Sequence, residues 1–163
     1  MPTNAATLHL VCGKIAAGKS TLIRKLGSMP GVIVVGEDQW LARLYPDTQN
    51  SLEDYARNAA RLRAAMGPHL IALLRAGLSV ALDFPANTPA SRRWMRGLFE
   101  QAGVAHQLHV LDVTDAVCKA RLRERNATGE HEFTVTDAQF DQFASHFVPP
   151  TEDEGFDVVL HRD

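Results

Sequence analysis

A glycine-rich loop near the start of the chain restricts its possible folds more than any other feature. Residues 13–20 read GKIAAGKS and match the pattern G-x-x-x-x-G-K-[ST]. A short apolar run over residues 8–11 leads into this loop, and the apolar spacing within residues 20–29 predicts that a helix follows it. Loops of this pattern bind nucleotide phosphates when they connect a strand to a helix. This position favours nucleotide binding over a simple glycine-rich turn.

The residue types in the loop explain how it would hold phosphate groups. Glycine at Gly13 and Gly18 permits backbone angles and a close approach that side chains would obstruct, so successive N–H groups can point at phosphate oxygens. Lys19 adds a positive charge near the β- and γ-phosphates, and the Ser20 hydroxyl is placed to coordinate Mg²⁺. The residues expected to contact the nucleotide are Gly13, Lys14, Ile15, Ala16, Ala17, Gly18, Lys19, Ser20 and Thr21.

Strand patterns and helical patterns alternate along the whole chain. The segments GVIVVG and SVALDF are almost purely apolar, as strands are when helices cover both faces of a parallel sheet. This alternation predicts one α/β domain over residues 1–163, with the three-layer P-loop NTPase fold: a five-stranded, mainly parallel sheet with helices on both faces. The expected strands cover residues 8–11, 31–36, 79–84, 106–113 and 156–161.

Capping residues and prolines predict several helix boundaries. Thr88 followed by proline marks a helix start, and this helix is expected to run to about Gly103. Residues 136–139 have the capping-box pattern that opens another helix. In the long helical segment over residues 52–73, the Gly-Pro pair at residues 67–68 is expected to kink or split the helix.

Composition and charge exclude several classes of protein. At 163 residues, with 45% hydrophobic and 22% charged residues, the chain has the balance of a globular domain. The 17 basic residues are nearly balanced by 19 acidic ones, so a nucleic-acid partner is not expected. No segment approaches the roughly 20 apolar residues of a membrane span, and Cys12 and Cys118 form no C-x-x-C pair typical of a zinc site. These features predict a cytoplasmic protein without a membrane partner.

Acidic residues follow two of the expected strands, where ligand sites lie in sheets of this type. Asp83 ends an apolar strand, which is the setting of the Walker B acid that holds Mg²⁺; a turn cap is the alternative. Glu37 and Asp38 follow the strand at residues 31–36, where either carboxylate could face the γ-phosphate across a cleft. A helix N-terminus enriched in acidic residues is the alternative for this pair.

Absent motifs narrow the class of nucleotide-binding protein. The chain contains no N-K-x-D or T-K-x-D motif for reading guanine, and no L-S-G-G-Q signature of transporter ATPases. The segment after Asp83 is not the D-x-x-G of a switch GTPase, and Phe84 stands where a ring ATPase has the glutamate that polarises water. A small kinase is the class that remains.

A kinase needs a carboxylate beside the acceptor hydroxyl and cations over the transferring phosphoryl group. Glu37 or Asp38 would supply the carboxylate. Arg121 and Arg125 are four residues apart, so on a helix they share one face and point at one spot. A solvated helix face, with Glu124 as a pairing partner, is the alternative for these arginines.

The same segments resemble those of the small P-loop kinases, a group that includes zeta toxin, chloramphenicol phosphotransferase and the kinase domain of polynucleotide kinase, together with proteins described as AAA-type ATP-binding. The shared segments are GKIAAGKST, GEDQW, VALDF and ARLRERN, which are spread over almost the whole chain. The resemblance implies a sheet with the strand order 2-3-1-4-5, in agreement with the five expected strands.

The resemblance also implies roles for residues around the phosphates. Asp38 matches the carboxylate that activates the acceptor hydroxyl. Lys19 and Ser20 match residues that bind phosphates and Mg²⁺, and Asp83 matches the Walker B acid. ATP and Mg²⁺ are therefore the expected cofactors.

A lid over about residues 121–136 is a further implication of the resemblance. Arg121 and Arg125 would belong to this lid, which closes over ATP and excludes water. The adenine would lie near Arg125 and Asn126.

One departure from the group concerns the acceptor. Polynucleotide kinases carry an arginine three residues after the catalytic aspartate, where this chain has Leu41, so a polynucleotide acceptor is less expected. The leading hypothesis is transfer of the γ-phosphoryl group to a hydroxyl of a small molecule. The alternative is a nucleotide-binding regulatory protein or slow NTPase without an acceptor. The sequence leaves open ATP or GTP, Glu37 or Asp38 as the base, and the oligomeric state.

Other residue sets have less specific interpretations. The arginines at positions 92, 93 and 96 are most simply a solvated helix face, and the seven histidines show no spacing typical of metal ligands. Five residues could form a mixed acceptor pocket, although aromatic residues at such positions more often belong to the core. These are Trp40, Tyr45, Tyr55, Phe84 and Asn87.

Overall fold

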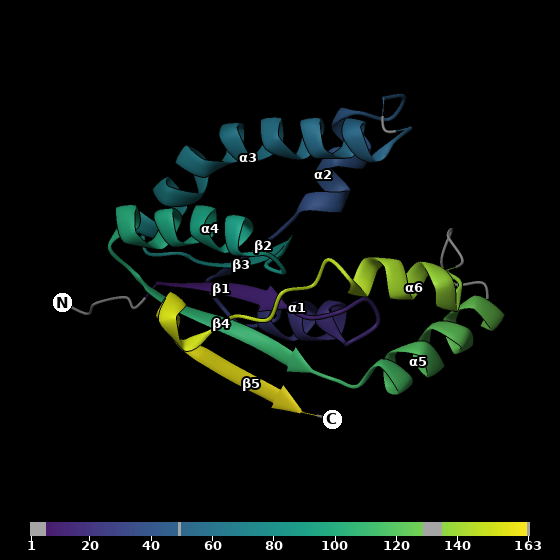
Figure 1. The fold of residues 1–163 in the computed structure, drawn as a ribbon. Coiled ribbons are helices and arrows are strands. Elements are labelled where there is room, and N and C mark those ends of the chain that lie inside the picture. The colour runs from purple at the N-terminus through teal and green to yellow at the C-terminus, as the bar shows by residue number, and fades with distance from the viewer. Residues whose placement is uncertain (1–5, 49, 129–134, 163) are drawn as a thin grey trace.

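The structure of the chain, a computed structural model, describes residues 6–48, 50–128 and 135–162. Its centre is a sheet of five strands in the order β2-β3-β1-β4-β5, and every neighbouring pair is parallel (Figure 1). The expected P-loop fold and its strand order are confirmed. The strands are β1 Thr7–Cys12, β2 Val32–Gly36, β3 Ser79–Pro85, β4 Ala105–Asp112 and β5 Val158–Arg162.

Helices cover both faces of the sheet. They are α1 Lys19–Gly27, α2 Glu37–Leu44, α3 Leu52–Arg75, α4 Pro89–Ala102, α5 Asp115–Thr128 and α6 Asp137–Ala144, and a 3-10 turn covers Glu152–Glu154. α2, α3 and α4 lie on one face, α1 lies on the other, and α5 and α6 stand beyond the carboxyl ends of the strands (Figure 1). None of the helices in the described ranges is long and apolar enough to cross a membrane.

Successive side chains of β1 point to opposite faces of the sheet and so join two cores. Leu8 and Leu10 are fully buried in the core that includes α3 and α4. Val11 instead packs with Ile23 and Leu26 of α1. Because both faces of β1 are buried, the start of the phosphate loop is anchored from both sides.

A third, smaller apolar cluster joins the phosphate loop to the helices beyond the sheet. Ala17 of the loop packs there with Leu122 of α5 and Phe140 of α6. The position of α5 and α6 relative to the loop is therefore set by buried apolar contacts.

The predicted helix boundaries at threonines are confirmed. Thr88 precedes α4, and its hydroxyl accepts a hydrogen bond from the Ser91 N–H at 3.2 Å. α4 ends before Gly103, which has a left-handed φ of 69°. Thr136 and Gln139 form both hydrogen bonds of the capping box at the start of α6.

Of the kink or split expected at the Gly-Pro pair of the long helix, the split is wrong. α3 runs without a break over 24 residues, with Pro68 inside it. Pro68 has no N–H group, so the carbonyl of Ala64 receives no helical hydrogen bond from it. Packing outweighs this loss, because α3 buries a stripe that includes Met66 and Leu70 in the core.

The expectation of a solvated arginine face on α4 is correct for Arg93, which is exposed, but wrong for Arg92 and Arg96. Arg92 is fully buried and donates to both carboxylate oxygens of Glu154, at 2.7 and 3.2 Å. It also donates to the carbonyl oxygens of Ala86 and Val148, both at 2.8 Å. Arg96 is half-buried and donates to the backbone carbonyl of Glu154. Helical spacing does not reveal these contacts, because the acidic partner is 62 residues away.

Three histidines without any spacing signal meet across neighbouring strands. His9 Nδ1 lies 3.0 Å from His109 Nε2, and His109 Nδ1 lies 2.9 Å from His161 Nε2. Burial lowers the pKa of His109 to about 4, and the two neighbouring imidazoles add to this shift. His109 is therefore neutral near pH 7, and the row is a hydrogen-bonded part of the sheet face.

Candidate active site

The phosphate loop adopts the backbone shape that its glycines were expected to allow. Gly18 has a φ of 108°, in the left-handed region that favours glycine. At Gly13 the constraint is space, since a Cβ atom there would lie 3.3 Å from the Cβ of Leu111. Ala16 has a φ of 64°, which is uncommon for a residue with a side chain. Such strained backbone is frequent at ligand-binding loops.

Lys19, the first residue of α1, bends back over the loop. Its Nζ donates to the carbonyl oxygens of Gly13 at 2.5 Å and Lys14 at 2.9 Å. Burial lowers the pKa of Lys19; the carboxylate of Asp83 opposes this shift, and the positive charge of Arg125 adds to it. Lys19, Asp83 and Arg125 therefore lie within electrostatic reach of one another.

α5 contacts the loop through an acid, Asp115, and a cation, Arg121. Lys14 Nζ lies 2.5 Å from the carboxylate of Asp115, at the start of α5. Arg121 Nη1 donates to the carbonyl oxygens of Ala16 at 3.3 Å and Ala17 at 3.2 Å. Arg121 thus faces the phosphate loop, and not the solvated surface that was the alternative for it.

Arg125 lies one helical turn after Arg121 and is half-buried. Its charge acts on Lys19, as the lowered pKa of that lysine indicates. Both arginines of the predicted pair are therefore on the side of α5 that faces the phosphate site. Their contact with a phosphoryl group stays a prediction.

Asn126 was predicted to lie near the adenine, and its amide is engaged within the fold. Asn126 Nδ2 donates to the Val135 carbonyl at 2.9 Å, and the Val135 N–H donates to Asn126 Oδ1 at 3.3 Å. This pair links the end of α5 to the start of α6. Residues 129–134 of the predicted lid lie outside the described residues.

Asn87, expected only as a possible pocket residue, holds the first glycine of the phosphate loop. The Gly13 N–H donates to Asn87 Oδ1 at 3.0 Å, and Asn87 Nδ2 donates to the Gly13 carbonyl at 3.1 Å. The Val148 N–H donates to the Asn87 carbonyl at 2.8 Å. The signal for this role was the position of Asn87 just after β3, because β3 is the neighbour of β1 in the predicted strand order.

Glu37 and Asp38 at the start of α2 have different environments. Glu37 is 1% exposed and accepts hydrogen bonds from the Tyr55 hydroxyl and from Arg63 Nε, the latter at 3.2 Å. Asp38 is exposed and forms no hydrogen bond or ion pair with the residues that the structure describes. The fold therefore uses Glu37 as a structural anion between α2 and α3.

The carboxyl of Asp38 nevertheless interacts electrostatically with residues of the phosphate site. Although the residue reaches solvent, partial burial of the carboxyl raises the pKa of Asp38, and the negative charges of Glu37 and Asp83 raise it further. The positive charge of Lys19 opposes the shift. Asp38 thus shares one electrostatic neighbourhood with the predicted Walker B acid and the loop lysine.

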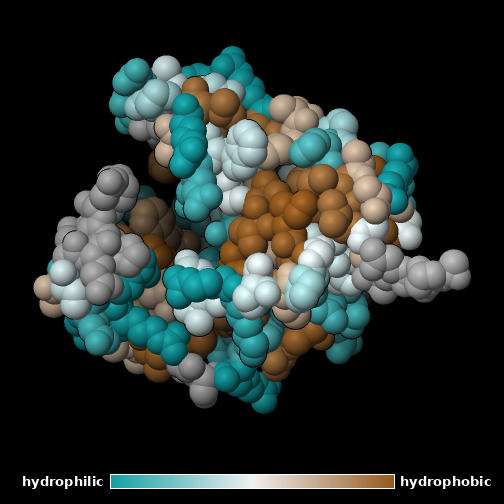
Figure 2. All heavy atoms as spheres, turned by 180° about the vertical axis from the view of Figure 1, so that it is seen from behind, coloured by the Kyte–Doolittle hydropathy of each residue, from teal (hydrophilic) through white to brown (hydrophobic). Residues whose placement is uncertain are grey.

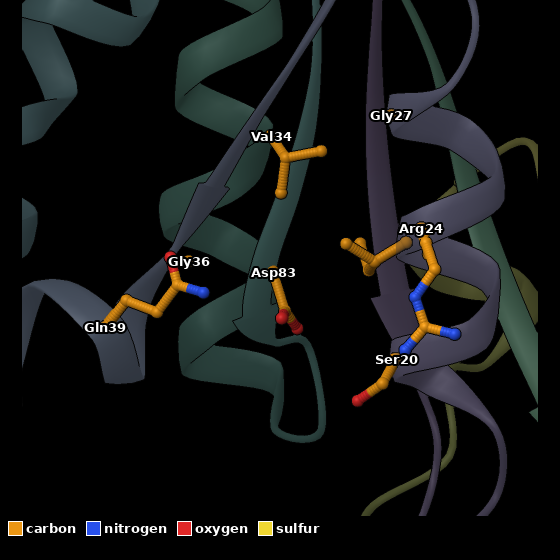
Figure 3. Close-up of a pocket in the computed structure, with 8 residues that line it drawn as sticks. Ser20, Arg24, Gly27, Val34, Gly36, Gln39 and Asp83 are labelled. Atoms are coloured by element: carbon orange, nitrogen blue, oxygen red, sulfur yellow. The ribbon is translucent and has the colours of Figure 1, made fainter.

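Ser20 and Asp83, the predicted metal ligands, line the same hollow between α1 and β3 (Figure 3). Burial raises the pKa of Asp83, and Lys19 opposes this shift. A hydroxyl and a carboxylate are ligands that suit Mg²⁺, which keeps several waters and phosphate oxygens as its other ligands. Groups of three or more His, Cys, Asp or Glu that could hold a metal are absent from the described ranges, so the fit is to a metal held jointly with phosphates.

The five residues proposed for a mixed acceptor pocket have different environments. Phe84 is fully buried in the core, and Tyr45 and Tyr55 pack against the same core. Trp40 is 45% exposed on α2, and the Asn87 side chain is hydrogen-bonded to Gly13 of the phosphate loop. The core interpretation, which was the alternative, fits the buried Phe84 and the half-buried Tyr45 and Tyr55.

A comparison with protein families agrees with this geometry. Residues 8–150 match the model of a family described as the AAA domain. The matched range includes every candidate residue of the phosphate site. No curated protein matches the chain.

Solved kinase structures share the fold at low sequence identity. A protein from Chloroflexus aurantiacus J-10-fl described as a candidate kinase is 18% identical, with a TM-score of 0.74 over 99% of this chain and 87% of its own. A gluconokinase from Sinorhizobium meliloti 1021 is 15% identical, with a TM-score of 0.61 over 98% and 84%. The Mycobacterium tuberculosis APS kinase CysC, in complex with AMPPNP and APS, is 21% identical, with a TM-score of 0.54 over 78% and 76%. At these identities the likeness shows the fold.

Proposed function

Because the chain belongs to the AAA domain family and has the fold of small P-loop kinases, we propose that it transfers the γ-phosphoryl group of ATP to a hydroxyl of a small molecule. The chain is a P-loop nucleotide-binding protein. The proposal adds the phosphoryl transfer, ATP as its donor and the kind of acceptor.

The environment of Asp38 carries the proposal. Glu37 accepts hydrogen bonds from Tyr55 and Arg63, whereas Asp38 has no polar partner among the described residues. Asp38 lies within electrostatic reach of Lys19, and its pKa is raised. A raised pKa makes a carboxylate a better proton acceptor. We therefore assign the role of base to Asp38 and not to Glu37.

The reaction follows from these positions. The acceptor oxygen would attack the γ-phosphorus as the bond from phosphorus to the bridging oxygen breaks, and ADP leaves with that oxygen. The hydroxyl proton would move to Asp38. Lys19 would release the carbonyls of Gly13 and Lys14 and donate to the phosphates, where Arg125 adds a second positive charge.

Ser20 and Asp83 would hold Mg²⁺ together with the phosphates. When bound, the metal supplies positive charge to the phosphoryl oxygens. The protein's own residues orient the donor: the loop N–H groups bind its oxygens, and Asn87 keeps the loop entry fixed through both polar groups of the Gly13 backbone.

An Asp38→Asn variant tests the proposal, with Asp47→Asn as a matched control on an exposed acid of the same region. Each variant would be assayed for binding of a fluorescent ATP analogue and for ATP-dependent phosphorylation of a metabolite library. We expect Asp38→Asn to bind the nucleotide within about twofold of the parent chain and to lose about 100-fold or more in transfer, because general-base catalysis contributes 10²–10⁴-fold. The control should keep both properties.

The competing function, a nucleotide-binding regulatory protein or slow NTPase, makes a different prediction. In that case no acceptor stimulates ATP consumption, and Asp38→Asn hydrolyses ATP at the rate of the parent chain. The same assay with GTP in place of ATP determines the donor.

A further inference from the structure

A groove extends from the phosphate site along α1, between this helix and the edge strand β2 (Figure 3). Its volume is about 420 Å³, which is in the range of small-molecule sites. Ser20 and Asp83 stand at the end next to the phosphate loop, so a molecule in the groove would lie beside the γ-phosphate.

One stripe of α1 forms a wall of the groove. Ser20, Ile23, Arg24 and Gly27 all line it, and their spacing of three and four residues places them on one face of the helix. The stripe begins with a hydroxyl at the phosphate end, continues with an apolar side chain and a cation, and ends with a residue that has no side chain.

A second glycine, Gly36 at the end of β2, also lines the groove. Its φ of -111° and ψ of 126° are extended backbone that any residue adopts. A Cβ atom at Gly36 would make ordinary contacts, at 3.9 Å with Gln39 and 4.0 Å with Asp83. Neither backbone conformation nor close packing therefore requires glycine at this position, and its effect is to leave space between Gln39 and Asp83.

Polar and apolar groups divide the groove. Arg24 on α1 and Gln39 on α2 lie on opposite walls, and neither side chain has a polar partner among the described residues (Figure 3). Val34 of β2 is 43% exposed and lies at the Gly27 end of the groove (Figure 3). Seen from behind, the molecule carries a broad apolar area on its surface (Figure 2). A ligand that matches this pattern has a hydroxyl at one end, an apolar carbon body, and an anionic group for Arg24.

We propose that the groove between α1 and β2 binds the phosphoryl acceptor, and that the acceptor is a small hydroxylated carboxylic acid whose carboxylate pairs with Arg24. This inference rests on the proposed function and adds the class of the acceptor. The acid's hydroxyl lies at the end formed by Ser20 and Asp83, with Asp38 adjacent in sequence to the lining residue Gln39. Arg suits this role because its planar guanidinium pairs with both oxygens of a carboxylate.

Phosphoryl transfer to the acid follows the same course as the reaction proposed above. The hydroxyl oxygen of the acid forms a bond to the γ-phosphorus, the bond between that phosphorus and the bridging oxygen breaks, and ADP leaves. The hydroxyl proton passes to Asp38, and the products are ADP and the phosphate ester of the acid. The carboxylate paired with Arg24 takes no part in the chemistry and determines which hydroxyl is presented.

Matched acceptors separate the charge requirement from the hydroxyl requirement. We would compare glycerate with glycerol, and para-(hydroxymethyl)benzoate with para-benzenedimethanol, as substrates with ATP and Mg²⁺. Each acid is expected to exceed its uncharged partner by about 10-fold or more in kcat/KM. Arg24→Gln should lower kcat/KM for the acids by about 10- to 100-fold, mainly through KM, and leave the alcohols unchanged, as expected for a charge-assisted hydrogen bond.

Two further variants test the location of the site. Lys25→Gln removes the same charge from the next residue of α1, which does not line the groove, and should leave both acceptor classes unchanged. Gly36→Ala adds a methyl group to the groove and should raise KM for the larger acid more than for glycerate. Affinity for a fluorescent ATP analogue should stay within about twofold in all three variants. Equal acceptor kinetics in Arg24→Gln, Gly36→Ala and the parent chain would overturn the proposal.

A binding measurement distinguishes failure of this inference from failure of the proposed function. The acids would be titrated into isotope-labelled protein saturated with a non-hydrolysable ATP analogue, and the side-chain amide signal of Gln39 followed by NMR. A shift that Arg24→Gln abolishes, without phosphorylation, supports the groove and contradicts the kinase function. Phosphorylation that depends on Asp38 but not on Arg24 supports the kinase and contradicts the groove. No shift with any acid at millimolar concentration also overturns the groove.

Discussion

The two walls of the phosphate site differ in how far the fold satisfies their polar groups. On the loop wall, Gly13 is bonded by Asn87, Lys19 donates to two carbonyls, and Arg121 donates to two more. On the α2 wall, Asp38 and Gln39 have no polar partner among the described residues. The loop wall is therefore preorganised for its ligand, whereas the polar groups of the α2 wall remain available to bind one.

This difference separates what a nucleotide requires from what an acceptor requires. Phosphates are bound mainly by backbone N–H groups, so the chain must hold a loop in one conformation, and internal hydrogen bonds do this. Specificity for an acceptor depends on individual side chains that are free to pair with it. Variants of the loop wall should therefore destabilise the fold and weaken nucleotide binding together, whereas variants of the α2 wall should impair function without destabilising the fold.

The largest effect is expected at Arg92, a buried cation that is linked to the loop wall through Val148 and Asn87. Arg92→Met would leave Glu154 without its partner and the carbonyls of Ala86 and Val148 without their donor. Breaking a buried ion pair costs about 3–5 kcal/mol. Urea unfolding should show this loss, and Arg93→Met, on an exposed neighbour, should change stability by less than about 0.5 kcal/mol. A loss below about 1 kcal/mol for Arg92→Met would mean that the contacts of Arg92 with Glu154, Ala86 and Val148 do not support the loop wall.

The next effect concerns the cation of the loop itself. Lys19→Ala should reduce turnover by about 100- to 1000-fold, the effect of removing one preorganised donor to a developing negative charge. Lys25→Ala on the same helix is the control. Both variants would be compared by steady-state kinetics and by titration with a fluorescent ATP analogue. Unchanged binding and turnover in Lys19→Ala would contradict nucleotide binding by the loop.

A smaller effect is expected from the side chain that bonds Gly13. Asn87→Leu leaves the Gly13 N–H and carbonyl without this partner and should cost about 1–3 kcal/mol of stability. Asn87→Asp keeps the acceptor for the N–H but adds a negative charge beside the loop. We expect Asn87→Asp to be more stable than Asn87→Leu in thermal unfolding, and to bind the ATP analogue more weakly than the parent chain. Equal nucleotide affinity in all three proteins would show that Asn87 is structural only.

Local patterns predicted the fold well, because they depend on residues close in sequence. The phosphate loop, the caps at Thr88 and Thr136, and the five strands each have a signature within a few residues, and the structure confirms them. The helix through Pro68 shows where a local rule fails, since burial along α3 outweighs the missing hydrogen bond.

Contacts between distant residues could not be predicted in the same way. Arg92 and Glu154, Asn87 and Gly13, and the row of three histidines join residues from 52 to 100 positions apart. No spacing rule connects such pairs, because only the packed fold brings them together. The sequence also could not separate Glu37 from Asp38, since the distinction lies in Tyr55 and Arg63 of another helix.

The smallest effect is expected for Asp38 of the α2 wall, because its ionised carboxylate should oppose folding when no ligand pairs with it. Because the pKa of Asp38 is raised above its ordinary value of 3.8, the folded state binds this proton more tightly than the unfolded chain does. Stability therefore falls as pH rises through this pKa, and the ionised carboxylate destabilises the fold at pH 7. Asp38→Asn should raise the Tm of the nucleotide-free protein slightly at pH 7, and this gain should disappear below about pH 3, where both proteins are neutral at this position. Asp47→Asn should show no gain at either pH. A lower Tm for Asp38→Asn at pH 7 would mean that Asp38 is part of the folded network, and that the contrast between the two walls is wrong.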